Sequence, residues 1–284
     1  MITLEQLQAG IVLPIDKPRQ WTSFQAVNKV KAIVRNSYGL KKFKIGHAGT
    51  LDPLATGLLL VCIGKATKEI PSLQDGDKVY TGTMVLGATT PCYDMERAVD
   101  QYYPYEHITP TLLDDIRHQF EGEIMQVPPM FSAVKIDGQR AYELARAESG
   151  EHGVESEGPR PKPVTIHSFE ITAFRKGLTP QPTLPERDGE HLGNHSITPD
   201  GHGKSPHLYD NPQCIIPAHL PQVDFRIHCG KGTYIRSIAR DFGEALGSGA
   251  FLASLRREQV GQYTIDRALT LDQVETYLTS NTEN

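Results

Sequence analysis

Apolar residues recur along the chain with two different spacings. Residues 24–35 carry the helical spacing most clearly, and Thr22 or Ser23 is the expected N-cap of that helix. Residues 78–86 alternate between apolar and polar positions, which predicts a strand, and the apolar run 58–63 indicates a buried strand or core segment. The other segments with helical spacing are 110–120, 141–147, 235–246 and 271–278, and the other alternating segments are 164–174 and 223–229. The chain is therefore expected to form one body in which helices and strands alternate.

One long segment breaks this pattern. Residues 177–221 hold eight prolines, five glycines and five of the eleven histidines, with little apolar periodicity. A segment of this composition buries too little apolar surface to offset the entropy lost on ordering, so we expect a mobile insertion between two strands. The histidines have no paired spacing, and a solvated loop explains them better than a metal site.

Composition describes an ordinary globular protein of 284 residues with a net charge of −5. The net negative charge argues against nucleic-acid binding, but the charge of one segment near the N-terminus does not. From Lys17 to Leu51 the chain has eight lysines and arginines and no carboxylate, and a one-sided basic patch can dominate the local field. The alternative is that Lys29, Lys31 and Arg35 simply form a solvated helix face.

Several classes of protein are disfavoured. There is no signal-peptide pattern, and the longest apolar run, 58–63, is too short for a membrane span. Four separated cysteines without a C-x-x-C pair argue against zinc. Motifs for a phosphate-binding loop, a dinucleotide fold, a serine hydrolase and a zinc protease are missing. Because no signal peptide or membrane span is predicted, we expect a cytoplasmic protein.

Asp52 is the best-marked candidate for catalysis. It is the one acidic residue between Asp16 and Glu69, it ends the basic stretch, and Gly46, Gly49 and Gly57 bracket its loop. Such glycines allow the backbone to approach a ligand closely. On local grounds alone, however, Asp before Pro53 is better explained as a helix N-cap with proline at the first helical position.

A second polar cluster, Lys231–Arg236, lies between a predicted strand and a predicted helix. Ile235 and Ile238 belong to the apolar face of that helix, so Arg236 should point elsewhere. If Arg236 meets Asp52, it would hold the carboxylate ionised and oriented. The alternative for Arg236 is an ordinary surface arginine. A glycosidase is disfavoured because no second catalytic carboxylate is evident.

The run Gly46–Gly57, GHAGTLDPLATG, resembles the signature of the bacterial TruB-type tRNA pseudouridine synthases. The resemblance covers about residues 10–175 and 222–275. It implies an α+β pseudouridine synthase fold, with a mixed, mainly antiparallel central sheet, flanking helices and an active cleft across the sheet. The other matching segments are 16–18, 22–23, 77–80, 127–135, 138–142 and 231–237.

The resemblance also implies a reaction. Uridine 55 in the T loop of tRNAs would be isomerised to pseudouridine, without cofactor or metal. Asp52 matches the catalytic aspartate, Tyr80 the tyrosine that stacks on the base and helps to remove the C5 proton, and Arg236 the arginine that pairs with the aspartate. The carboxylate could attack C1′ or abstract the C2′ proton, and both roles stay open. The residues implied to contact RNA or line the pocket are His47, Lys17, Lys68, Asp94, Lys135 and Tyr234.

The chain departs from the family pattern in three places. Gln20 stands where relatives often have glycine, which predicts a different turn. The 177–221 insertion has no counterpart, and the chain ends too soon after residue 271 for a C-terminal PUA domain. We therefore expect a single catalytic domain over residues 1–284 that holds the RNA, and a contribution of the insertion to RNA binding stays open.

Two other classes of protein stay open. One is an RNA-binding module, such as a tRNA-folding chaperone without turnover, although it would not need Asp52, Tyr80 and Arg236 together. The other is a guide-RNA-dependent subunit of the dyskerin type, which shares the loop motif but needs a PUA domain and partner proteins. The sequence favours a stand-alone enzyme with tRNA as its partner, no membrane and no obligatory protein partner.

Overall fold

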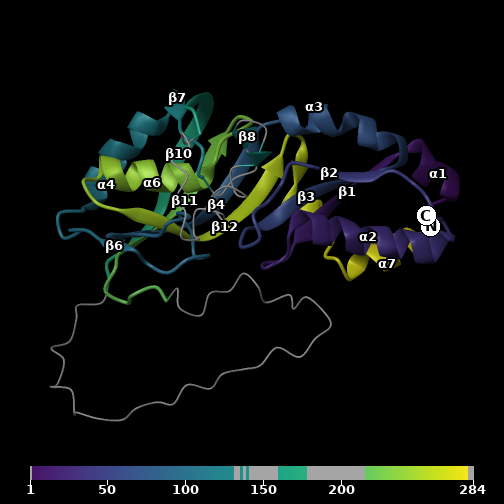
Figure 1. Ribbon diagram of the computed structural model, residues 1–284, viewed down its shortest axis with the longest axis horizontal. Helices are drawn as coiled ribbons and strands as arrows, with labels where there is room; N and C mark the ends of the chain where they lie inside the picture. Colours follow the sequence, from purple (N-terminus) through teal and green to yellow (C-terminus); the bar gives the residue numbers. More distant parts are fainter. Residues whose placement is uncertain (1, 131–134, 137–138, 141–158, 178–214, 281–284) are drawn as a thin grey trace, which may run out of the picture.

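The computed structural model describes residues 2–130, 135–136, 139–140, 159–177 and 215–280. Nine strands form one twisted sheet, in the order β1-β3-β12-β4-β11-β10-β7, with β2 on β3 and β13 on β12 (Figure 1). Among these strands β12 and β3 pair in parallel, and the other pairs are antiparallel. The expected mixed, mainly antiparallel sheet is confirmed. Its strands are β1 (Ile11–Lys17), β2 (Ile45–Ala48), β3 (Thr56–Ile63), β4 (Lys78–Leu86), β7 (Gly122–Gln126), β10 (Lys162–Arg175), β11 (Gln222–Cys229), β12 (Ala250–Val260) and β13 (Tyr263–Thr264).

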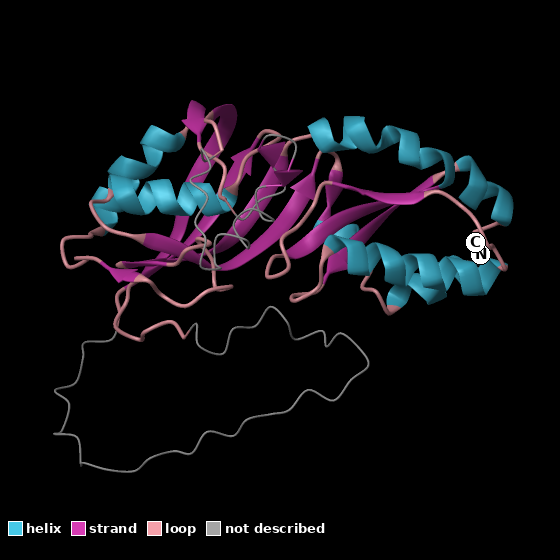
Figure 2. Cartoon of the chain, in the orientation of Figure 1, coloured by secondary structure: helices cyan, strands magenta, loops and turns pink. Residues whose placement is uncertain are grey.

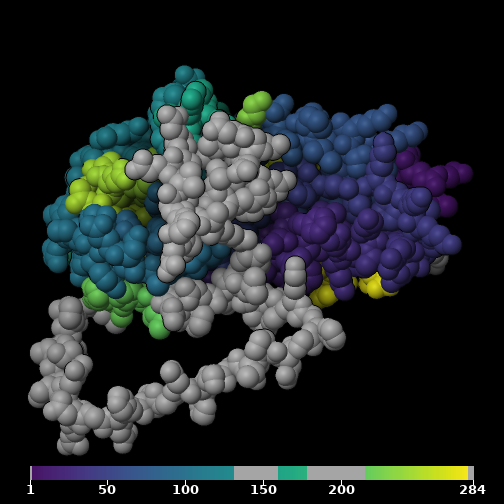
Figure 3. Space-filling model, viewed as in Figure 1, coloured from purple at the N-terminus to yellow at the C-terminus, as the bar shows by residue number. Residues whose placement is uncertain are grey.

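Helices flank the sheet towards its two ends, as Figure 2 shows. Two short pairs, β5 (Ala88–Thr89) with β6 (Gln101–Tyr102) and β8 (Lys135–Ile136) with β9 (Gln139–Arg140), lie outside the main sheet. In the space-filling view the N-terminal residues form one end of the molecule, and α4 and α6 belong to the other (Figures 1 and 3). The helices are α1 (Leu4–Ala9), α2 (Ser23–Tyr38), α3 (Ile70–Asp75), α4 (Pro110–Arg117), α6 (Ile235–Ala245) and α7 (Gln273–Thr279), with 3-10 turns η1 (Gly64–Glu69), η2 (His118–Phe120) and η3 (Ile265–Arg267).

Helix α2 shows how local sequence determines an element. The Thr22 hydroxyl accepts the Gln25 amide, and the Gln25 side chain accepts the Thr22 amide, which completes a capping box. The helix ends at Gly39, whose φ of 65° suits glycine. Its apolar stripe packs into the core, but Phe24 does not belong to it, because this side chain is 69% exposed. The predicted helix is confirmed, but Phe24, the first apolar residue in the 24–35 spacing, does not share its buried face.

Other predicted elements agree with the structure to different degrees. The strand at 78–86 is confirmed with the same bounds as β4. The helix at 110–120 becomes a 3-10 turn after Arg117. The helix predicted at 141–147 and most of the 177–221 insertion lie outside the described residues. At the end of that segment Leu220 is buried against Phe251 and Val85, so these last residues pack on the body of the protein.

Candidate active site

The Asp52 loop joins β2 to β3. The Ala55 amide donates to the Asp52 carbonyl over 3.1 Å, which closes a turn, and strand β3 follows directly. The alternative of a helix cap at Asp52 is therefore wrong. Ser23 holds the loop from α2, because its hydroxyl accepts the Leu51 amide at 2.9 Å and donates to the Leu51 carbonyl at 3.2 Å. The carboxylate is thus presented from a fixed turn with its side chain 38% exposed.

Lys17, the last residue of β1, also supports this loop. Its ammonium donates to the carbonyls of Pro18, Trp21 and Pro53 at 2.9, 2.7 and 3.3 Å, and the residue is 0% exposed. Burial lowers the pKa of Lys17 to about 8, although Asp52 opposes the shift. Lys17, which the resemblance implies faces RNA or uracil, uses its donors on these protein carbonyls.

Arg236 reaches Asp52 from the first turn of α6, as the family resemblance implied. Its Nε donates to Asp52 Oδ2 over 2.9 Å, and its Nη1 donates to the Cys92 carbonyl over 3.2 Å. The residue is 4% exposed, so the alternative of a surface arginine is wrong. Burial disfavours the charge, but the carboxylates of Asp52 and Asp94 outweigh it and raise the pKa of the Arg236 guanidinium. The guanidinium is therefore a fixed positive charge beside Asp52.

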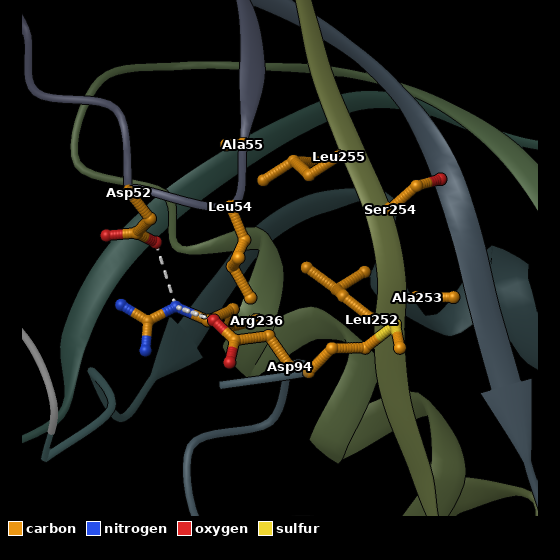
Figure 4. A pocket seen from close by; sticks show the side chains of 10 residues that line it. Asp52, Leu54, Ala55, Asp94, Arg236, Leu252, Ala253, Ser254 and Leu255 are labelled. Carbon is orange, nitrogen blue, oxygen red and sulfur yellow. Dashed lines mark hydrogen bonds and ion pairs between the residues drawn. The ribbon is translucent and has the colours of Figure 1, made fainter. Parts of the chain in front are cut away.

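Asp94 approaches the same guanidinium. Its Oδ2 lies 3.8 Å from Arg236 Nε, and its Oδ1 accepts the Glu96 amide at 2.9 Å. Figure 4 shows the Asp52 and Asp94 side chains directed at Arg236, beside a small hollow lined by Leu54. Burial raises the pKa of Asp94, and Arg236 limits that rise. The two carboxylates thus differ, since Asp94 is buried behind Arg236 and Asp52 is open to solvent.

A cavity of about 490 Å³ opens in front of these groups. This volume lies within the range of about 300–1,000 Å³ that is usual for small-molecule sites. Asp52 and Arg236 line it together with Tyr80 from β4 and Tyr234 from the start of α6. The Tyr234 backbone is held by Gln126, which accepts its amide at 2.8 Å and donates to its carbonyl at 3.2 Å. The cleft lies over β4 and β12, the middle strands of the sheet, where the fold prediction placed it.

Tyr80 is largely buried in the floor of this cavity. Burial raises the pKa of its phenol, and the neighbouring Arg257 opposes the shift. At neutral pH the group is a protonated phenol with an aromatic face and one polar atom.

Arg257 is a site residue that the sequence did not indicate. It lies on β12, is 1% exposed, lines the same cavity and donates to backbone carbonyls on both sides of Asp52. Its Nε donates to the Leu58 carbonyl at 2.8 Å, Nη2 to Gly49 at 3.1 Å and Nη1 to Thr50 at 3.4 Å. The stretch 250–260 mixes apolar and charged residues without alternation, so no local signal marked either the strand or its buried arginine.

The remaining predicted contacts are scattered. His47 is half-buried on β2, where burial first and Arg257 second lower its pKa, and it is not among the residues that line the cavity. Lys68 is exposed on η1 and lines a different cavity with Lys42, Lys44 and Lys65. The side chain of Lys135 lies outside the described residues. The structure therefore brings Asp52, Tyr80, Arg236, Asp94 and Tyr234 together, but not His47, Lys17 or Lys68.

Sequence comparison identifies the family of this chain. Residues 35–182 match the N-terminal domain model of the TruB family pseudouridylate synthases, and residues 236–284 match the C-terminal domain model of tRNA pseudouridylate synthase B. A tRNA pseudouridine synthase B of Flavobacterium johnsoniae is 47% identical over 271 residues, which cover 95% of this chain and 96% of the relative. The corresponding protein of Phocaeicola vulgatus is 39% identical over 95% of this chain and 93% of its own. The chain belongs to the TruB family of pseudouridylate synthases.

Solved structures show the same fold at lower identity. The Cbf5–Nop10–Gar1 complex contains a chain that superposes with a TM-score of 0.60 at 24% identity. The archaeal box H/ACA sRNP Nop10–Cbf5 complex gives a TM-score of 0.55 at 23% identity. The present chain is covered to 98% and 96%, but it spans little more than half of those chains, 58% and 54%. In the described part of the present chain, no helix has the length and apolar character needed to cross a membrane.

Proposed function

We propose that this chain converts uridine 55 in the T loop of tRNAs to pseudouridine, with Asp52 as the catalytic carboxylate. The observation that carries the proposal is the buried Arg236 guanidinium, 2.9 Å from an Asp52 side chain that faces a cavity also lined by Tyr80. The family supplies the reaction type, and relatives named tRNA pseudouridine synthase B supply the substrate class.

The reaction breaks the N1–C1′ bond of uridine, turns the uracil and joins its C5 to C1′. N1 ends with a proton and C5 loses one, so the change is an isomerisation. Asp52 either bonds to C1′ or removes the C2′ proton, and both roles require an ionised carboxylate, here oriented by the hydrogen bond from Arg236. The present geometry is compatible with each role.

Tyr80 and Arg257 suit the later step. The aromatic face of Tyr80 offers a stacking surface for a flipped base. To accept the C5 proton, the Tyr80 phenol first releases its own proton to solvent, and the positive charge of Arg257 stabilises the phenolate that forms, because the guanidinium already opposes the effect of burial on the Tyr80 pKa. Tyr234 would line the uracil end of this pocket, and Asp94 would line the small adjoining hollow and help to position Arg236.

The same proposal places the enzyme in the cytoplasm as a single catalytic domain, with tRNA as its partner. It needs no cofactor, no metal for the reaction and no obligatory protein partner. The segment at about 177–221 is an interruption of that domain. If deletion of residues 178–220 leaves the affinity for tRNA unchanged, the segment has no part in binding RNA.

Position-specific mapping tests the proposed function. Purified protein is incubated with a T stem-loop RNA, and pseudouridine is located by carbodiimide modification and primer extension. We expect product at position 55, and none in a matched RNA that carries cytidine there. Product at a different uridine would contradict the assigned substrate, and no product in either the stem-loop or an intact tRNA would contradict the enzyme assignment.

A further inference from the structure

Three side chains that could ligate a metal ion meet on the sheet, and they are not among the residues that line the catalytic cavity. Asp77 directly precedes β4, His167 lies on β10 and His228 on β11, and these three strands are neighbours. The Nε2 atoms of His167 and His228 lie 3.3 and 3.9 Å from the same oxygen, Asp77 Oδ2. One potential ligand atom from each residue lies within 4.8 Å of the other two.

A β-bulge creates this arrangement. Ile166 pairs with Cys229 and Ser168 with His228, so β10 carries one extra residue, His167, between the two pairs. Ile166 and Phe169 are both buried although they are three residues apart, which shows that the inward and outward alternation shifts at the bulge. His167 consequently lies beside His228, with ring centroids 4.6 Å apart. Bulges commonly redirect a side chain in this way.

The ligand set has a clear chemical preference. Two imidazole nitrogens and one carboxylate oxygen suit Zn²⁺ and related divalent transition metals, with a fourth position left for water or another ligand. Ligand atoms about 2.0–2.1 Å from a tetrahedral ion are separated by roughly 3.3–3.5 Å, close to the observed His167–Asp77 distance. The side chains of Asp77, His167 and His228 are 50%, 38% and 41% exposed, so rotation can close the remaining gap.

We propose that Asp77, His167 and His228 form a binding site for a divalent transition-metal cation such as Zn²⁺. The bound ion joins the neighbouring strands β4, β11 and β10, next to the start of β4 and the end of β11. Asp77 stands three residues before Tyr80, and His228 precedes the turn that leads to α6 and Arg236. The ion therefore stabilises the strands that carry the catalytic groups and takes no part in the reaction.

Metal titration of the full-length chain tests the site. Protein is freed of metal with a chelator and titrated with ZnCl₂ by calorimetry, in wild type, His167→Gln and Asp77→Asn. The matched control is His118→Gln, which removes an exposed histidine that also has a carboxylate neighbour, Glu121 at 3.3 Å, but lies outside the three-ligand cluster. All of these variants keep the histidines of 177–221. A loss of zinc binding in the cluster variants but not in the control therefore distinguishes this site from zinc bound by those histidines.

We expect both cluster variants to lose one equivalent of zinc, or to bind it more than about tenfold more weakly, while the control binds as wild type does. Zinc should raise the thermal unfolding temperature of wild type and control but not of His167→Gln. Co²⁺ in the wild type should give the visible absorption of a four-coordinate site, and this signal should be lost in His167→Gln. Equal zinc stoichiometry and affinity in wild type and His167→Gln would overturn the proposal, whatever the outcome for pseudouridine formation.

Discussion

At the scale of single residues, Gln20 shows what the backbone of this site requires. Its φ is 69°, in the left-handed region that favours glycine, and its amide donates to the Pro53 carbonyl at 2.8 Å. The turn is therefore compatible with a glycine, and the prediction of a different shape for this turn finds no support. The hydrogen bond to the Asp52 loop holds Gln20 in this conformation, which costs a side-chain-bearing residue about 1–2 kcal/mol.

We predict that Gln20→Gly is more stable than Gln20→Ala by about 1 kcal/mol. Glycine removes the backbone strain of the left-handed conformation, and this gain exceeds the cost of its larger conformational entropy in the unfolded state. Both substitutions remove the same side-chain contacts, so their difference isolates the backbone. Urea unfolding at pH 7 measures it. Equal free energies of unfolding for the two variants would show that the turn is not strained.

At the scale of elements, β12 and its Arg257 organise the site. Gly57 of β3 lies so close to β12 that an added Cβ would stand 2.4 Å from the Arg257 carbonyl oxygen. The glycine thus serves strand packing, whereas the sequence suggested an approach to ligand. The Arg257 guanidinium then binds the loop carbonyls of Gly49 and Thr50 on one side of Asp52 and that of Leu58 on the other. We infer that Arg257 positions the loop that carries Asp52.

We predict that Arg257→Lys lowers the single-turnover rate constant by roughly tenfold to a hundredfold, because a lysine cannot hold three carbonyls at fixed angles and the carboxylate moves. Affinity for RNA should change little. The matched control is Arg256→Lys, since Arg256 pairs with Asp16 at 2.8 Å and does not line the catalytic cavity. An unchanged rate constant in Arg257→Lys, with only a loss of stability, would restrict Arg257 to a structural role.

At the scale of the whole molecule, sequence patterns predicted the helices and strands whose formation depends on residues close together in the chain. Helix α2 and strand β4 follow from their own periodicity. The Asp52–Arg236 pair joins residues 184 positions apart, and local reasoning alone favoured a helix cap and a surface arginine there; the family motif was needed to connect them. β12 was missed because a central strand with buried Arg257 lacks alternation. Lys17 counts in the basic run but is buried, which a count of charges along the chain cannot show.

A second property of the whole molecule is a basic surface formed by lysines from separate segments of the chain. Lys42, Lys44, Lys65 and Lys68 are exposed around a cavity of about 280 Å³ at the end of the sheet near α1. If this surface binds RNA phosphates, counterions are released when tRNA binds, despite the net charge of −5.

We predict that Lys42→Ala/Lys68→Ala weakens tRNA binding to a similar extent for any T-loop sequence. The slope of log affinity against log salt concentration should become shallower by about 1 to 2. Filter binding between 50 and 200 mM salt is a suitable measurement. The control Lys176→Ala/Arg267→Ala removes the same charge from two other exposed positions, and an equal effect in both double variants would refute a localised RNA surface.

The most direct measurement of the central claim is tritium release from a T stem-loop labelled at C5 of uridine 55, with wild type and Asp52→Asn compared. Binding of the same RNA by both proteins is measured in parallel, so that loss of affinity is separated from loss of chemistry. We predict one tritium released per uridine converted by the wild type, and no release above background by Asp52→Asn at saturating protein. Full release by the variant would contradict the assignment of Asp52, and no release by the wild type would contradict the proposed reaction.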